Sequence, residues 1–129
     1  MQIGDTRTIT VCAREPWNDT GIDLDADGVY RFNATGHWID LVIWTDADGY
    51  DSLLIQHQFE SKRRVANQKW FTLIGTIGKH DDTAFVIGKE KTWTSPAQGR
   101  LFAYANDVPG FYFNNFGHLT LTVERLTQE

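Results

Sequence analysis

The sequence is poor in cysteine, proline and methionine, with one Cys, three Pro and one Met among 129 residues. A single cysteine cannot form an internal disulfide, and Cys12 lies in an apolar run at residues 9–13, which predicts a small buried side chain. The four histidines lack the spacing of a zinc motif. The sequence also contains no Gly-x-Ser-x-Gly motif and no phosphate-binding glycine loop. These absences argue against the common hydrolase and zinc-enzyme classes.

Basic charge is also scarce, because 12 Lys and Arg face 17 Asp and Glu, a net charge of -5. Nucleic-acid binding needs a basic stripe, and the only basic cluster, at residues 62–64, is short. No apolar run approaches the roughly 18 residues of a membrane span. The N-terminus lacks the charged and apolar regions of a signal peptide. We therefore predict no nucleic-acid partner, no membrane span and a cytoplasmic protein, with leaderless export left open.

The chain is instead rich in short β-strand patterns separated by Gly and Asp turns. Its length suits one domain, and its 41% apolar content suits a globular protein. A nearly continuous apolar run at residues 70–77 predicts a central strand, whereas residues 53–59 are the only place for a short helix. Further strands are predicted at residues 8–13, 21–24, 29–34, 83–88, 100–105 and 118–124. We predict one all-β domain over residues 1–129, a β-sandwich with little or no helix.

The most informative segment is the loop at residues 105–117, which joins two predicted strands. Its polar side chains comprise one carboxylate and three amides, from Asp107, Asn106, Asn114 and Asn115. The Pro109-Gly110 pair predicts a turn that returns Asp107 toward the later asparagines. Such oxygen donors, without Cys or His, suit calcium better than zinc. The same residue types also dominate ordinary turns, so composition leaves a calcium site and a plain turn both open.

Residues 106–117 read Asn-Asp-Val-Pro-Gly-x-Tyr-x-Asn-Asn-x-Gly. This pattern resembles the calcium loop of the PA-I type galactophilic lectins, small bacterial β-sandwich proteins that bind galactose through a calcium ion. Residues 20–38 are more weakly similar to the first strands of that family. Together these segments cover about a third of the chain, and residues 41–69 have no counterpart that can be aligned.

The resemblance implies a jelly-roll fold, calcium as the cofactor, galactose-like carbohydrate as the partner, and a homo-oligomer. It implies that Asp107, Asn114 and Asn115 bind the ion, together with main-chain carbonyls at Asp40 and Phe111. Two vicinal sugar hydroxyls then complete the calcium shell, which places Asp107, Asn114 and Asp40 at the sugar as well. Asp40 stands where the family has an aromatic residue, and its carboxylate offers a further ligand. Phe111 stands where the family has a small residue, so its ring narrows the sugar site.

Three residues of the unaligned middle segment are candidates for sugar contacts. Trp44 offers an apolar face on which a sugar ring can stack. Asp51 closes the acidic segment 46–51, which suits a second cation or sugar hydroxyls, although a solvated turn has the same composition. His57 lies between two glutamines and suits a hydrogen bond to sugar, although a lone histidine is often structural. Residues 23–28 begin like an EF-hand loop but lack its twelfth-position glutamate, which predicts a hairpin turn.

These observations lead us to expect a calcium-dependent lectin that recognises galactose-like sugars and is not an enzyme. One alternative is a structural or interaction β-sandwich in which the metal only pins the loop. A more distant alternative is a glycosidase, because the sequence places paired carboxylates only in segments that are predicted as turns.

Overall fold

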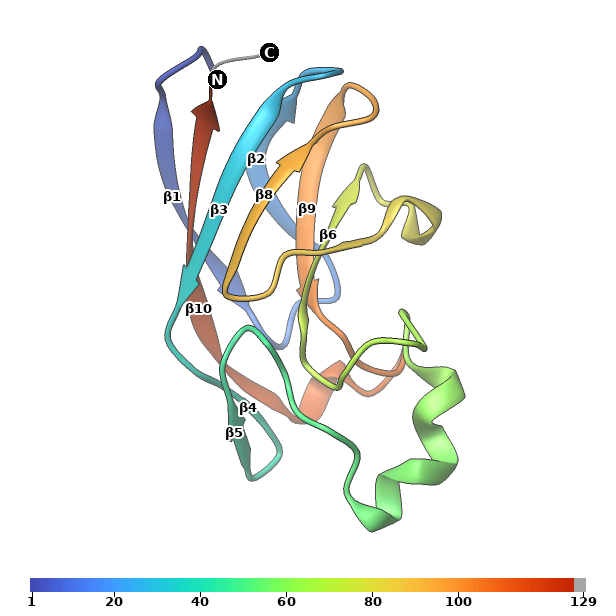
Figure 1. Cartoon of the computed structure of the whole chain (residues 1–129). Coiled ribbons are helices and arrows are strands. Elements are labelled where there is room, and N and C mark those ends of the chain that lie inside the picture. The colour runs from blue at the N-terminus through green and yellow to red at the C-terminus, as the bar shows by residue number, and fades with distance from the viewer. Residues whose placement is uncertain (127–129) are drawn as a thin grey trace.

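The computed structural model describes residues 1–126, apart from the side chains of Leu54 and Ile55. Two antiparallel sheets form the predicted all-β sandwich, with little helix (Figure 1). One sheet has the order β5-β4-β10-β3-β8, with β1 paired to β10, and the other has the order β2-β9-β6-β7. The strands are β1 (Thr6–Cys12), β2 (Asn18–Leu24), β3 (Val29–Thr35), β4 (Trp38–Asp40), β5 (Ile43–Thr45), β6 (Leu73–Ile77), β7 (Phe85–Val86), β8 (Glu90–Thr94), β9 (Gly99–Ala105) and β10 (Asn115–Leu126). The 3₁₀ helices are η1 (Leu54–Lys62), η2 (Asp81–Thr83) and η3 (Tyr112–Asn114).

The core lies between the two sheets, and its pattern follows from strand alternation. In β2 and β3 every second residue is buried, so that Ile22 of one sheet and Phe32 of the other enter the same cluster. Burial of each such large side chain contributes about 1.5–3 kcal/mol. Strand β6 is buried at all positions and lies between β7 and β9, which confirms the predicted central strand.

Three of the observed strands, β4, β5 and β8, were not predicted from the sequence. Strand β8 reads Glu-Lys-Thr-Trp-Thr, and as an edge strand it packs only Trp93 against the core. The predicted hairpin at residues 23–28 is wrong. The turn exists, but it carries the chain from β2 in one sheet to β3 in the other, because the apolar residues of both strands face a shared core.

The two ends of the sandwich differ in character. Figure 1 shows the N-terminus and the end of β10 at one end, and the β4–β5 hairpin, η1 and the loop before β10 at the other. Helix η1 occupies the segment where the sequence allowed a short helix. None of the helices in residues 1–126 is long and apolar enough to cross a membrane. The loop-bearing end therefore carries the irregular segments in which the predicted site residues lie.

Candidate functional site

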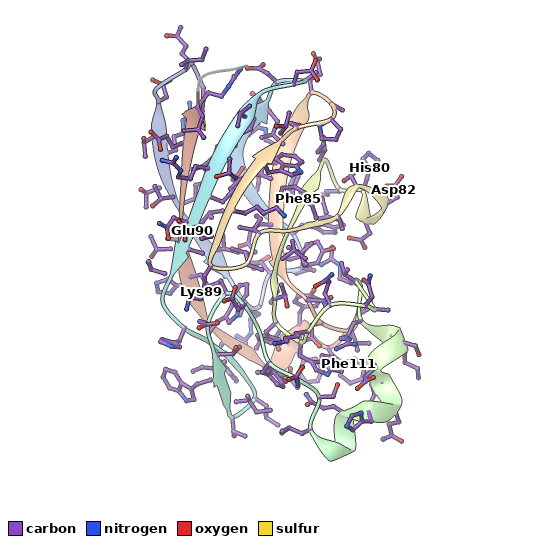
Figure 2. The ribbon with its side chains drawn as sticks, viewed as in Figure 1. His80, Asp82, Phe85, Lys89, Glu90 and Phe111 are labelled. Atoms are coloured by element: carbon purple, nitrogen blue, oxygen red, sulfur yellow. The ribbon has the colours of Figure 1, made fainter. Side chains whose placement is uncertain are left out.

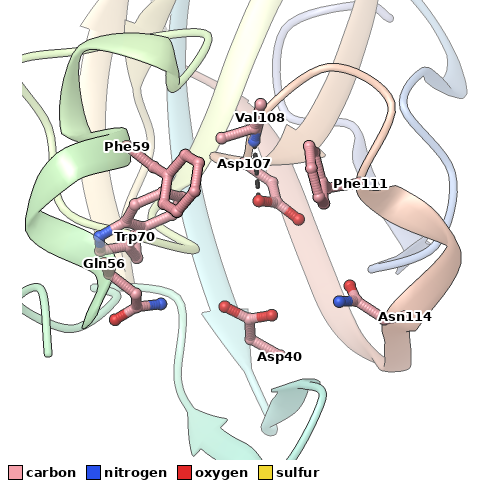
Figure 3. A pocket seen from close by; sticks show the side chains of 8 residues that line it. All are labelled: Asp40, Gln56, Phe59, Trp70, Asp107, Val108, Phe111 and Asn114. Carbon is pink, nitrogen blue, oxygen red and sulfur yellow. Dashed lines mark hydrogen bonds between the residues drawn. The ribbon is translucent and has the colours of Figure 1, made fainter.

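A cleft of about 170 Å³ opens at the loop-bearing end of the sandwich (Figure 3). Strand β4, helix η1 and the loop before β10 each contribute to its walls. Four of the residues singled out in the sequence line it together, although Asp40 is far from the others in the chain. The lining residues are Asp40, Gln56, Phe59, Trp70, Asp107, Val108, Phe111 and Asn114.

The loop between β9 and β10 folds back on itself, as the Pro109-Gly110 turn predicts. Phe111 N donates to Val108 O at 3.0 Å, and Gly110 has φ +90°, which a side chain would oppose. The Tyr112 hydroxyl then donates to Ala105 O at 2.6 Å and closes the loop over the end of β9. The return of the chain brings the side chains of Asp107 and Asn115 into contact.

Two amide oxygens, one from the cleft residue Asn114 and one from its neighbour Asn115, are buried without a hydrogen-bond donor. Asn115 Nδ2 donates to Ala13 O at 3.1 Å and to Asp107 Oδ2 at 3.0 Å, and since both partners are acceptors, they fix the amide orientation. Asn115 Oδ1 and Asn114 Oδ1 have no partner among the residues described. An unsatisfied buried acceptor costs about 1–3 kcal/mol. The arrangement therefore indicates a ligand with positive charge or a hydrogen-bond donor.

The carboxylates of Asp40 and Asp107 face each other across the cleft (Figure 3) and are almost fully buried. Burial raises the pKa of Asp107 to about 6, against hydrogen bonds from Val108 N and Asn115 that lower it, and the charge of Asp40 raises it further. Burial also raises the pKa of Asp40, while its hydrogen bond from Tyr50 opposes the shift. Two buried carboxylates this close disfavour ionisation, and a cation between them would remove that penalty.

The donor set suits a hard cation. Asp40 and Asp107 offer carboxylate oxygens, and Asn114 and Asn115 offer neutral amide oxygens, the ligand types that calcium takes. Asn115 pairs with Asp40 across β10 and β4, so all four residues belong to one neighbourhood. Nowhere in residues 1–126 do three or more His, Cys, Asp or Glu side chains gather at one metal-sized site. Any metal held here therefore depends on amide and main-chain oxygens.

A hydrogen-bond chain supports Asp40 from behind, and the sequence analysis missed it. The Tyr50 hydroxyl donates to Asp40 Oδ2 and accepts from Gln56 Nε2 at 2.7 Å, while Gln56 Oε1 accepts from Leu53 N at 2.9 Å. Burial and the hydrogen bond to Asp40 raise the pKa of Tyr50 far above its ordinary value, so the hydroxyl remains a donor. The chain of bonds ties the orientation of the Asp40 carboxylate to the start of η1.

Aromatic rings form the other half of the cleft. Figure 3 shows Phe59 in front of Trp70 on one side and the ring of Phe111 on the other. Trp70 Nε1 donates to Ser52 Oγ at 2.6 Å, and the Arg63 guanidinium lies 5.0 Å from the Trp70 ring. Trp70 is thus held rigidly with part of its surface at the cleft, rather than serving the core alone.

The other predicted sugar contacts lie outside this cleft. Trp44 is 69% exposed on β5. Asp51 and His57 line a separate polar pocket, where His57 Nδ1 lies 2.8 Å from Glu60 Oε1. Another histidine, His80, lies beside η2, well away from Phe111 at the cleft (Figure 2). The structure thus groups Asp40, Phe111 and the loop residues but does not bring Trp44, Asp51 or His57 to them.

Similarity to known proteins is found among solved structures. No protein family matches the sequence, and no curated protein does either. A solved structure, described as "EclA N-terminal domain; PllA-like lectin", superposes with a TM-score of 0.68 over 92% of this chain and 94% of that chain. This chain has the fold of a lectin domain. At 20% identity the similarity shows the fold alone.

Proposed function

We propose that this protein is a lectin that binds galactose-like carbohydrate with the help of a calcium ion. The observation that carries the proposal is the pair of unsatisfied amide oxygens, Asn114 Oδ1 and Asn115 Oδ1, beside two buried carboxylates. Asp40 and Asp107 would hold the ion with these amides, and the resemblance of residues 106–117 adds the carbonyls of Asp40 and Phe111. When bound, calcium supplies open coordination positions for two vicinal sugar hydroxyls.

Polar and aromatic side chains of the cleft would contact different parts of a sugar. Asp107 is held in place by Val108 N at 2.7 Å and by Asn115, so its position is set before a ligand arrives. The carboxylates and the Gln56 amide can exchange hydrogen bonds with sugar hydroxyls. Phe111, which is 48% exposed, offers an apolar face for the C–H side of a sugar ring, in place of the predicted Trp44.

The main alternative is a metal that only pins the loop. An open cleft with an aromatic wall favours a ligand, because a purely structural site gains nothing from partly exposed rings such as Phe111. The fold shared with a lectin domain also supports a ligand-binding site over a purely structural metal. Galactose preference itself rests on the loop motif.

Calorimetry with galactose, mannose and fucose, each with calcium and with chelator, tests the proposal. We expect galactose to bind only with calcium, and Asp107→Asn to abolish binding. Asp5→Asn makes the same replacement of a carboxylate by an amide near the N-terminus, and it serves as the matched control. Calcium stabilisation without binding to any of these sugars or to a broad glycan array would support the structural alternative. Turnover of an aryl galactoside would identify a glycosidase instead.

A further inference from the structure

The exposed apolar side chains are concentrated at the end of the molecule that carries the cleft. Eight large apolar side chains are exposed among those whose burial is described, and all but Ile3 fall in segments 41–53 and 111–116. Figure 1 shows the β4–β5 hairpin and the loop before β10, which carry most of them, at the end away from the termini. These residues are Leu41, Val42, Trp44, Leu53, Phe111, Phe113 and Phe116.

Three short strand segments give part of this surface a flat face. Phe116 pairs with Ile39 and Ile39 pairs with Trp44, and paired residues of neighbouring strands point to the same face. Because side chains alternate, this face is opposite to the one that carries Asp40 and Asn115. We call Leu41, Val42, Trp44, Phe113 and Phe116 the apolar collar; they belong to the segments at the cleft-bearing end of the molecule and do not line the cleft.

The tip of the β4–β5 hairpin has an unfavourable sequence for a simple turn. Asp40 pairs with Ile43, so Leu41 and Val42 form a two-residue connection. Leu41 has φ +58°, a conformation that costs a non-glycine residue roughly 1–2 kcal/mol, and a two-residue turn with positive φ at its first residue favours Gly there. Val42 is 77% exposed. Both side chains are more than half exposed, so the apolar tip indicates contact with another surface.

Cations lie on the aromatic rings around the collar, although the whole protein is acidic. The Arg14 guanidinium is 5.1 Å from the Phe116 ring and donates to Phe113 O at 2.8 Å. The Lys62 ammonium is 5.4 Å from the Phe59 ring. Aromatic and aliphatic side chains flanked by Lys and Arg are typical of surfaces that enter the headgroup region of a bilayer. Lipid phosphates complement these cations.

We propose that the apolar collar docks onto a phospholipid membrane, so that the cleft meets a glycan carried by a lipid of that membrane. Leu41 N donates to Asn114 O at 3.1 Å, so the hairpin tip and the cleft approach a surface together. The proposal rests on the proposed sugar binding for the glycan, whereas the collar contact is independent of it. Membrane contact and sugar binding then act as two linked sites, which raises the total affinity.

Phosphatidylcholine vesicles with and without a galactosylceramide test the proposal, in the presence of calcium. We expect galactosylceramide vesicles to bind the protein about tenfold more tightly than a soluble galactoside does, with a blue shift of tryptophan emission. Plain vesicles should bind weakly. The double variant Leu41→Asn/Val42→Thr should lose the tenfold gain and bind soluble galactose normally. It should fold well, because Asn tolerates positive φ. Ile3→Asn, an equally exposed change at the opposite end, should bind as wild type does.

The outcomes separate this proposal from the lectin proposal. If the double variant and the wild type bind both kinds of vesicle equally, the docking proposal is overturned and sugar binding stands or falls by calorimetry. A dimer that depends on Leu41 and Val42 in sedimentation velocity, without vesicle binding, would overturn it in favour of self-association. If no sugar binds but plain vesicles bind through the collar, docking stands and the lectin proposal fails.

Discussion

The segment that joins β9 to β10 has a closed side, which packs against residues 64–69, and an open side, which faces the cleft. A buried asparagine lies on each side, and the two differ in their hydrogen bonds. On the closed side, Asn106 is fully buried, accepts from Val65 N, and donates to the carbonyls of Val65, Gln68 and Lys69 at 2.9–3.2 Å. On the open side, nine residues later, Asn115 is equally buried and its Oδ1 has no donor among the described residues. Asn106 is therefore a structural clamp for the segment at 65–69, whereas Asn115 keeps a buried acceptor without a donor.

The charged side chains also differ between the closed side and the open side. Arg64 anchors the closed side, where it pairs with Asp81 at 3.1 Å, donates to Pro16 O, and packs 3.2 Å from the Tyr104 ring. Asp40 and Asp107 on the open side face each other instead, and burial raises the pKa of both. One loop thus combines a satisfied face that fixes its shape with an unsatisfied face that can bind. Substitutions on the two faces should have separable effects.

The largest effect is expected on the closed side. Asn106→Ala removes one accepted hydrogen bond and two amide hydrogens shared among three carbonyls, and at about 1 kcal/mol for each hydrogen we expect the free energy of unfolding to fall by about 3–4 kcal/mol. Urea denaturation in chelator measures this loss. Asn67→Ala, an exposed amide in the adjoining segment, should change stability by less than about 0.5 kcal/mol. A loss near that of the control would mean that Asn106 does not act as a clamp.

The metal-free protein should become less stable as the pH rises from about 4 to about 6.5. Asp107 has a pKa of about 6 in the folded chain against 3.8 as the ordinary value. The folded state therefore binds more protons in this interval, and its stabilisation is lost as pH rises through the folded pKa, by about 3 kcal/mol. Urea denaturation at several pH values, with Asp107→Asn subtracted, isolates the contribution. If the difference in the free energy of unfolding between the wild type and Asp107→Asn stays constant from about pH 4 to about pH 6.5, the expectation is wrong.

Calcium should stabilise the folded protein, and this gain should depend only on residues of the open side. A ligand that binds only the folded state adds about 2.7 kcal/mol at a hundredfold excess over its dissociation constant. We expect Asp107→Asn to abolish this gain and to raise the melting temperature of the metal-free protein, because a neutral amide replaces a buried charge. Asp82→Asn on the exposed η2 turn is the control and should keep the full calcium response. Loss of the response in both variants would contradict a site at Asp107.

The sequence predicted the parts of this arrangement that depend on neighbours in the chain. Asp107 and Asn115 are eight residues apart, and the Pro109-Gly110 turn between them is a local signal. The alternating strands were predicted for the same reason. Strand β8 was missed because its Glu and Lys residues belong to an exposed edge and carry a weak strand signal.

Contacts between distant segments could not be predicted in this way. Trp44 was predicted to contact the sugar, but the indole that lines the cleft is the buried Trp70, which reaches it through the pairing of residue 70 with Tyr50. The turn after Leu24 was taken as a hairpin because local sequence does not say in which sheet the next strand lies. The calcium, the sugar and the oligomer remain predictions.

The smallest effect concerns the support of Asp40. Tyr50→Phe removes the hydroxyl that donates to Asp40 Oδ2 and accepts from Gln56 Nε2, so the carboxylate loses its fixed orientation. Loss of such a partner behind a metal ligand lowers metal affinity by about 10–100-fold, and we expect about tenfold because Asp107 and the amides remain. Stability should fall by only about 1 kcal/mol. Calorimetric titration with calcium separates the two effects. Tyr30→Phe is the matched control, because the Tyr30 hydroxyl accepts from Asp25 N and makes no contact with the cleft. Equal calcium affinities for the two variants would show that the Asp40 carboxylate is not a ligand, and would leave the carbonyls, Asp107, Asn114 and Asn115 to hold the ion.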